Sequence, residues 1–181
     1  YAALTVMNQV LGGGFTGQLF KNVRSRQGLA YSVFGTYSSR YDRPGVLSMG
    51  CQTKSESTVH AIEAIVAEAR KMTTEEVTDE ELELAKDSYL NSFVFNFDST
   101  AEIISRLMTY DYYGYPPDFL QKTKESIEKV TKADVLRAAR AHLRPDAMQI
   151  LVVGRPEDFD RPLSTLGEVR SIDVTIPTPG K

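Results

Sequence analysis

The chain has 181 residues, which is enough for one domain with a substantial hydrophobic core. Hydrophobic residues make up 41% and charged residues 25%, as in an ordinary globular domain. The formal net charge of −3 provides no basic field for nucleic acid or an anionic membrane surface, so we expect neither as a partner. The single cysteine, Cys51, excludes an internal disulfide and a cysteine-based zinc site. No apolar run approaches the roughly 20 residues that span a bilayer, and the compartment stays undetermined.

The first third of the chain reads as two helical segments followed by a hairpin. We expect a helix over residues 1–11, because Tyr1 already lies inside helical periodicity. Three consecutive glycines then break the helix, since each loses much backbone entropy on folding. Helical periodicity resumes over residues 16–27, with Thr16 as a candidate cap and Gly28 at the position of a left-handed C-terminal cap. A chain that starts in a helix without an initiator methionine is expected to be a fragment or trimmed form of a longer protein.

Two strands should follow. Residues 29–39 alternate, with Leu29, Tyr31, Val33 and Tyr37 on one face. Residues 40–45 carry turn chemistry, and residues 46–53 form a second alternating run. This pattern predicts a β-hairpin.

The rest of the chain is mainly helical. An apolar stripe predicts a helix over residues 56–72. Further helices begin at Ser/Thr-x-x-Glu/Asp capping patterns or at the Pro116–Pro117 pair. Their expected extents are Thr78 to about Phe97, Ser99 to about Tyr113, residues 117–128, and Thr131 to near His142.

The end of the chain should supply one further strand. The nearly continuous apolar run Met148–Val153 predicts a central strand, and Ser171–Ile176 is a candidate edge strand in an otherwise irregular tail. The element order indicates an α+β fold, with several helices packed on one face of a mainly antiparallel sheet. We divide the chain into a domain over residues 1–155 and a tail over residues 156–181.

The run LGGGFTGQLFKNVRSRQGLAYSV, which begins at Leu11, is the most informative part of the chain. It resembles the signature of the C-terminal half of pitrilysin/insulinase-type zinc peptidases, the inverted zincins that include the mitochondrial processing peptidase. Weaker likenesses extend the resemblance over roughly residues 1–155. They are LAKDSYLNSFVFN (84–96), YGYPPDF (113–119), residues 130–143 and ILVVG (150–154). The implied fold is the LuxS/pitrilysin-like two-layer sandwich.

The resemblance implies a clam-like metalloendopeptidase of two similar halves. One half carries H-x-x-E-H and a distal glutamate that hold zinc, and the other half closes over the peptide substrate. An arginine and a tyrosine seven residues later, here Arg24 and Tyr31, are assigned to the substrate carbonyls and the tetrahedral intermediate. The loop of Gly12, Gly13, Gly14 and Phe15 is assigned to substrate binding. Zinc therefore belongs to a partner domain or subunit with H-x-x-E-H, and this chain alone should neither hold zinc nor cleave peptides.

Each assigned residue also has a plainer interpretation. The glycine triplet resembles a phosphate loop but lacks G-x-x-x-x-G-K-[ST], so a helix break or a flexible loop near the substrate remains. Arg24 could be an exposed or salt-bridged helix residue. Tyr31 could be a half-buried strand aromatic.

Other chemistry-bearing residues read as structural. His60 opens an H-x-x-E pattern, but Ala64 stands where the second histidine is needed. His142 suits the dipole of a helix end. Ser32 and Ser38 have no histidine partner in the pattern. The acids at positions 75, 76, 79–81 and 83 read as a solvated helix start, and the tyrosines at 110, 112, 113 and 115 as packing at a helix end.

Three functions stay open from the sequence. The first is the substrate-closing, non-zinc half of a zinc endopeptidase. The second is a non-catalytic scaffold or regulatory domain of the same fold, because fold alone does not establish activity. The third is a phosphate-binding module, which would require nucleotide to change the stability of the domain.

Overall fold

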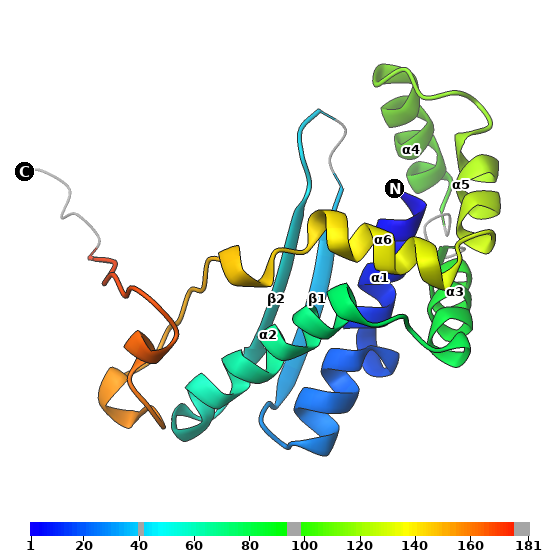
Figure 1. Cartoon of the computed structure of the whole chain (residues 1–181). Coiled ribbons are helices and arrows are strands. Elements are labelled where there is room, and N and C mark those ends of the chain that lie inside the picture. The colour runs from blue at the N-terminus through cyan, green and yellow to red at the C-terminus, as the bar shows by residue number, and fades with distance from the viewer. Residues whose placement is uncertain (40–41, 94–98, 176–181) are drawn as a thin grey trace, which may run out of the picture.

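We analysed a computed structural model of the chain, which describes residues 1–39, 42–93 and 99–175. Helix α1 (Ala2–Gly12) lies against an antiparallel hairpin of strands β1 (Ser32–Ser38) and β2 (Val46–Gln52). Helices α2 (Thr58–Thr74) and α6 (Lys132–His142) pack with α1 to build the helical layer (Figure 1). This arrangement confirms the expected α+β class with helices on one face of an antiparallel sheet.

The remaining helices extend to one side of this body. They are α3 (Asp79–Phe93), α4 (Thr100–Tyr112) and α5 (Phe119–Glu128). The end expected for α3 near Phe97 lies outside the described residues. Short 3-10 turns connect or follow the main elements, namely η1 (Gly14–Thr16), η3 (Ser55–Ser57), η5 (Pro145–Ala147), η6 (Pro156–Asp158) and η7 (Leu163–Thr165).

The capping patterns in the sequence form as expected. At α6 the hydroxyl of Thr131 accepts the Asp134 backbone N–H at 3.2 Å, and the Asp134 carboxylate accepts the Thr131 backbone N–H at 3.0 Å. Ser99 and Glu102 form the same reciprocal pair at the start of α4. Each pair satisfies donors that the first helical turn leaves without a partner, so the helix starts are fixed locally.

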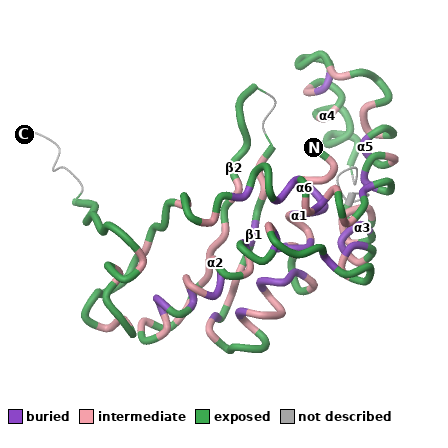
Figure 2. Tube along the Cα trace, viewed as in Figure 1, coloured by how far each residue is buried: buried purple, intermediate pink, exposed green. Residues whose placement is uncertain are grey.

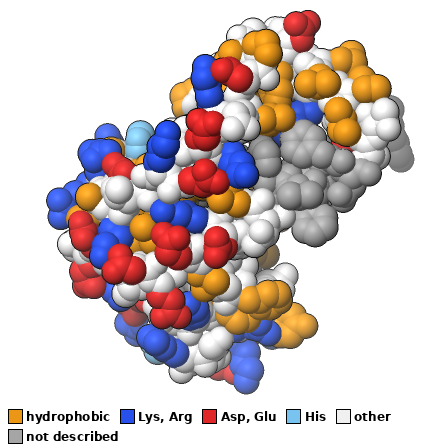
Figure 3. Space-filling view, turned by 90° about the vertical axis from the view of Figure 1, so that its right-hand side faces the viewer, with side chains coloured by type: hydrophobic (Ala, Val, Ile, Leu, Met, Phe, Trp, Pro, Cys, Tyr) orange, Lys and Arg blue, Asp and Glu red, His pale blue; other side chains and the backbone are white. Residues whose placement is uncertain are grey.

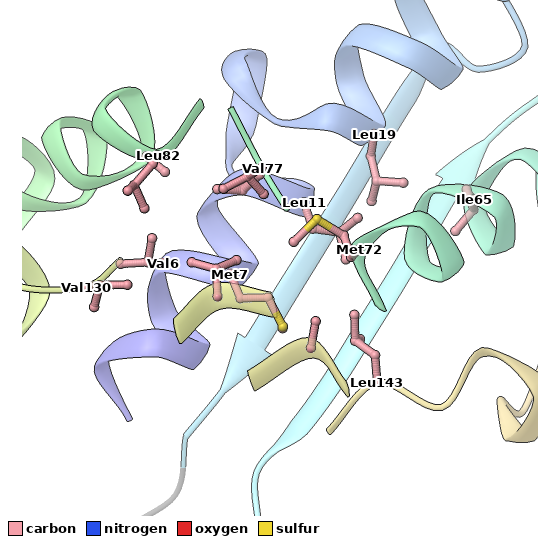
Figure 4. Close-up of a cluster of buried hydrophobic side chains, with 14 of the residues drawn as sticks. Val6, Met7, Leu11, Leu19, Ile65, Met72, Val77, Leu82, Val130 and Leu143 are labelled. Carbon is pink, nitrogen blue, oxygen red and sulfur yellow. The ribbon is translucent and has the colours of Figure 1, made fainter. Parts of the chain in front are cut away.

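The core lies between α1 and the elements around it. Val6, Met7 and Leu11 of α1 are at most 1% exposed (Figure 4). Ile65 and Met72 of α2 reach the same cluster, together with residues that follow α5 and α6. Figure 2 shows the buried positions concentrated along these elements. Burying one such side chain stabilises a fold by about 1.5–3 kcal/mol, so α1 is the centre of the packing.

The hairpin register agrees with the predicted alternation. Val33 pairs with Cys51, Gly35 with Met49 and Tyr37 with Leu47. Val33, Leu47, Met49 and Cys51 pack against the core, while Phe34 on the opposite face is 50% exposed.

The predicted third strand is wrong in this structure. Residues 148–153 carry no strand assignment, although Met148 contacts the core. Leu151 is 76% and Val153 94% exposed. A strand needs a neighbour to accept its backbone hydrogen bonds, and the described sheet contains only β1 and β2. The apolar run therefore does not join the sheet that the structure describes.

The tail is attached to α2. Asp160 accepts the backbone N–H groups of Val59 and His60 at 2.8 and 3.2 Å, and Arg161 forms an ion pair with Glu63 at 2.6 Å. A carboxylate at a helix N-terminus satisfies orphan donors and complements the dipole. Residues 171–175 have no strand assignment and Ile176 lies outside the described part, so the proposed edge strand and the division at residue 155 stay predictions.

Candidate functional site

The candidate site is built on an unusual helix. The helix expected over residues 16–27 begins only at Gln18, because Gly17 is extended. Thr16 does not cap it, since its hydroxyl donates to Gly13 C=O at 3.2 Å. Phe20–Arg26 form a π-helix, η2, in which Gln27 N–H donates to Asn22 C=O at 3.2 Å. Such wide turns occur mostly as short insertions and are frequent at functional sites. The sequence pattern predicts helix here but does not distinguish the α from the π form.

The π-helix is anchored on two of its sides. Leu19 and Val23 are fully buried in the core. Next to them, Gln18 Nε2 donates to Glu81 Oε1 at 3.0 Å, and Asn22 Nδ2 donates to Glu68 Oε2 at 2.7 Å. These contacts join η2 to α2 and to the start of α3, and they fix its rotation.

Phe20 and Arg24 are four residues apart on η2 and contact each other. Both are half-buried, and the Arg24 guanidinium carbon lies 4.5 Å from the centre of the Phe20 ring. Phe15 meets the same ring edge to face, with centroids 4.9 Å apart and planes at 82°. Phe15 itself is 78% exposed. We call Phe15, Phe20 and Arg24 the aromatic–arginine stack.

The chain turns from η2 into β1 at Gly28, as the sequence predicts. Gly28 has φ +64°, and its N–H donates to Arg24 C=O at 3.1 Å. The next N–H, that of Leu29, donates to Val23 C=O at 3.1 Å, so two backbone hydrogen bonds close the helix around a left-handed glycine. A side chain at Gly28 would strain the backbone. The Tyr31 N–H then donates to Gln52 C=O at 2.8 Å, so Tyr31 lies at the base of the hairpin.

The structure places the assigned donors at this corner but outside the core. The Tyr31 side chain is 81% exposed, so the half-buried strand interpretation does not describe it. Arg24 forms no ion pair or hydrogen bond with a side chain in residues 1–39, 42–93 or 99–175, which leaves the salt-bridged interpretation without a partner. Within those residues no hydrogen bond or ring contact joins Arg24 to Tyr31 directly.

Close backbone packing explains why two members of the triplet are glycine. A Cβ on Gly12 would lie 2.3 Å from Gly35 Cα, so this glycine permits the close approach of α1 to β1. A Cβ on Gly13 would lie 2.4 Å from Gln9 C=O. Gly14 has φ +61° and open space around it, and it turns the chain so that Phe15 reaches outward. The helix break is therefore confirmed, while substrate contact by the triplet stays a prediction.

The positions examined for a metal do not form a site. His60 is exposed, Ala64 is buried, and no three His, Cys, Asp or Glu side chains gather within the described part of the chain. The described residues therefore do not fit zinc. Burial raises the pKa of the Cys51 thiol.

The acidic segment is an exposed helix start, as predicted, and Glu81 takes part in capping α3. Glu81 accepts the Thr78 backbone N–H at 2.9 Å and the Gln18 amide on its other oxygen. Burial alone would raise the pKa of the Glu81 carboxyl. These hydrogen bonds, with the nearby charge of Lys21, bring that pKa below its ordinary value.

The tyrosine-rich segment packs only in part as expected, because Tyr112 and Tyr113 are exposed. Tyr110 is buried, and its ring lies 5.2 Å from Phe119, while Tyr115 lies 4.4 Å from Phe119. The outer side of α4 is apolar and exposed, and Figure 3 shows hydrophobic side chains gathered over this upper part of the molecule. A shallow cavity of about 660 Å³ lies there, lined by Ile104, Met108 and Tyr112 among others. No described helix is both long and apolar enough to cross a membrane.

The fold and the corner define an α+β domain that presents an exposed phenol and a half-buried guanidinium and has no zinc ligand set of its own among the described residues. Comparison with known proteins gives the same class. Residues 1–89 match the family described as "Peptidase M16 inactive domain". This match confirms the resemblance to the pitrilysin-like family that the signature carries, and a solved M16 inactive domain shares the fold.

Individual relatives agree with this assignment. The chain is 34% identical over 103 residues to an uncharacterized zinc protease YmxG of Bacillus subtilis, covering 57% of this chain and 25% of the relative. It is 26% identical over 149 residues to a non-peptidase homolog YmxG of Helicobacter pylori, covering 82% and 34%. A peptidase M16 inactive domain from Pseudomonas fluorescens superposes with a TM-score of 0.71 and 27% identity, covering 80% of this chain and 34% of that one.

The chain spans about a quarter to a third of the length of these curated relatives. Several relatives are named as zinc proteases, which associates zinc with the family. Phe20 is the site residue that sequence reasoning missed. Its spacing of four residues from Arg24 on a predicted helix is the signal that could have found it.

Proposed function

We propose that this chain is the substrate-closing half of a zinc-dependent endopeptidase, with Arg24 and Tyr31 as its catalytic residues. One observation carries the proposal. A phenol that is 81% exposed and a guanidinium without a carboxylate partner in the described structure flank the Gly28 corner. Both groups therefore keep donors available for a bound peptide.

The chemistry suits these two side chains. Peptide hydrolysis places negative charge on the former carbonyl oxygen in the tetrahedral intermediate. A guanidinium and a phenol O–H stabilise that charge, and losing one such donor typically lowers the rate about 10²–10³-fold. Zinc, held by the H-x-x-E-H partner domain or subunit, would activate the water there. The role of this chain is to bind the carbonyls and stabilise the oxyanion.

The loop before η2 is proposed to lie along the peptide. Gly14 turns the chain, and the exposed Phe15 supplies an apolar surface beside the Arg24 guanidinium. Gly12 and Gly13 contribute through the close packing that holds the loop. Their proposed substrate contacts would be made by backbone groups, because glycine has no side chain.

A second function has a specific observation in its favour. The relative of Helicobacter pylori is named a non-peptidase homolog, and it aligns with 82% of this chain. The alternative is therefore a scaffold or regulatory domain of the same fold. A purely structural copy has no chemical need for an exposed phenol at residue 31, so the function of that group separates the two proposals.

The test combines this chain with its H-x-x-E-H partner and measures cleavage of a quenched fluorescent peptide. We expect Tyr31→Phe to lower kcat about 10²-fold or more, with zinc content unchanged. Tyr112→Phe is the matched control, because Tyr112 on α4 is 82% exposed but lies away from the corner. Full activity of Tyr31→Phe would remove the catalytic role, and absence of cleavage in the unaltered pair would favour the scaffold.

A further inference from the structure

The proposed function assigns no role to Phe20, whose ring contacts the Arg24 guanidinium. The Phe20 ring contacts both Phe15 and the Arg24 guanidinium. It comes from the π-helix, whose rotation is fixed by buried Leu19 and Val23. The Phe20 ring is thus a fixed surface rather than a freely rotating side chain.

We propose that Phe20 is a positioning residue that orients the Arg24 guanidinium for its role in the site. The ring centre lies 4.5 Å from the guanidinium carbon, within the range of a cation–π contact. The inference rests on the proposed function of Arg24, but it concerns a residue that does not itself touch substrate.

The choice of an aromatic ring as support has a chemical consequence. A carboxylate partner would hold the guanidinium through two of its N–H groups and offset its charge. A ring contacts the flat face instead, and it leaves the five N–H donors at the edge available. Arg26 on the same helix shows the contrast, because its Nη1 donates to Asn22 Oδ1 at 3.1 Å.

Phe15 adds a second contact to the Phe20 ring. Its edge-to-face contact at 4.9 Å limits the rotation of the Phe20 ring. The stack therefore links the turn at Gly14 to the guanidinium through two contacts. Fixing the guanidinium before substrate arrives lowers the ordering cost that a long, flexible side chain otherwise imposes on binding.

The first experiment examines the stack in the isolated chain by NMR. We expect the Arg24 side-chain protons to be shifted upfield by the Phe20 ring current, whereas those of Arg26 are not. In Phe20→Leu the Arg24 shift should disappear, and in Phe20→Tyr it should persist. Phe119→Leu, which removes a half-buried ring from the distant aromatic cluster, should leave Arg24 unchanged. An unshifted Arg24 in the unaltered chain would overturn the proposal.

The second experiment is a double-mutant cycle on peptide cleavage by the chain with its H-x-x-E-H partner. We expect Phe20→Leu to lower kcat/KM about two- to fivefold, the size of one cation–π contact, with Phe20→Tyr restoring it. In an Arg24→Ala background, Phe20→Leu should have no further effect, since its action passes through the guanidinium. An equal loss in both backgrounds would assign Phe20 to general stability and overturn the proposal.

The two proposals fail in different ways. If Arg24→Ala lowers cleavage strongly and Phe20→Leu does not, the positioning role is wrong and the function of Arg24 stands. If Arg24→Ala leaves cleavage unchanged, the proposed function of Arg24 is wrong, and the positioning role fails with it even where the ring-current shift is present.

Discussion

Replacing Gly12 by alanine separates two physical effects that predict opposite results. Helix propensity alone favours alanine over glycine by about 1 kcal/mol within a helix such as α1. The tertiary structure opposes the change, because the new Cβ would lie 2.3 Å from Gly35 Cα and 2.5 Å from its nitrogen. Both neighbouring atoms belong to the backbone, so no side chain can rotate away.

The magnitude follows from that distance. Ordinary contacts begin at 3.4 Å, so α1 and β1 must separate by about 1 Å in a close-packed interior. Overpacking costs about 1–3 kcal/mol, and a clash between two backbones lies in the upper part of that range, at about 2–3 kcal/mol. After the gain in propensity of about 1 kcal/mol we expect a net loss of about 1–2 kcal/mol. For a domain of this size the melting temperature should fall by about 2–8 °C.

Thermal unfolding followed by circular dichroism measures the effect. Gly35→Ala provides the companion variant, because its Cβ would meet Gly12 Cα at 2.9 Å and the flexible end of Leu19 at 3.3 Å. The overpacking penalty of Gly35→Ala in free energy of unfolding should be smaller than the overpacking penalty of Gly12→Ala, before any propensity gain is subtracted. A Gly12→Ala chain that melts at or above the unaltered temperature would refute the close-packing account. The result also decides how activity data on this glycine are interpreted, since an unstable variant cannot report substrate contact.

Two further predictions follow from other parts of the fold. Thr131→Ala should destabilise the domain by about 1 kcal/mol, measured by urea unfolding at pH 7, because it removes the cap of α6. The hydrogen bonds from Thr131, with Arg137, lower the pKa of the Asp134 carboxyl. Its contribution is therefore present above the ordinary pKa and is lost as the pH falls through the lowered value. The penalty of Thr131→Ala should shrink in that acid range, and a constant penalty would contradict the assignment. Leu151→Lys should reduce self-association in light scattering without lowering the melting temperature, because Leu151 is 76% exposed on an apolar segment outside the described sheet. A clear fall in melting temperature would show that Leu151 is packed.

Much of the secondary structure was predictable because its signals are local. The capping pairs at Ser99 and Thr131 satisfy backbone donors within the first turn of their own helices, so no distant contact is needed. Gly28 was predictable for the same reason, since its positive φ is a property of the residue and its immediate turn. The hairpin register followed from strict alternation on both strands.

The third strand was not predictable from its own residues. The run Met148–Val153 has the composition of a strand, but strand formation depends on a neighbour that the described sheet does not supply. The sequence gives the propensity of a segment, whereas its hydrogen-bond partners are a property of the whole fold.

The same division holds at the candidate site. The sequence by itself determined the family, the helix-to-strand corner and the identity of the two donors, because these depend on residue types at short spacing. Only the tertiary structure decided that η2 takes the π form, that Gly12 packs on Gly35, that Tyr31 is exposed and that Arg24 lies on Phe20. Each of these depends on how elements pack against one another, and packing is set by the shapes of surfaces that meet only when the chain has folded.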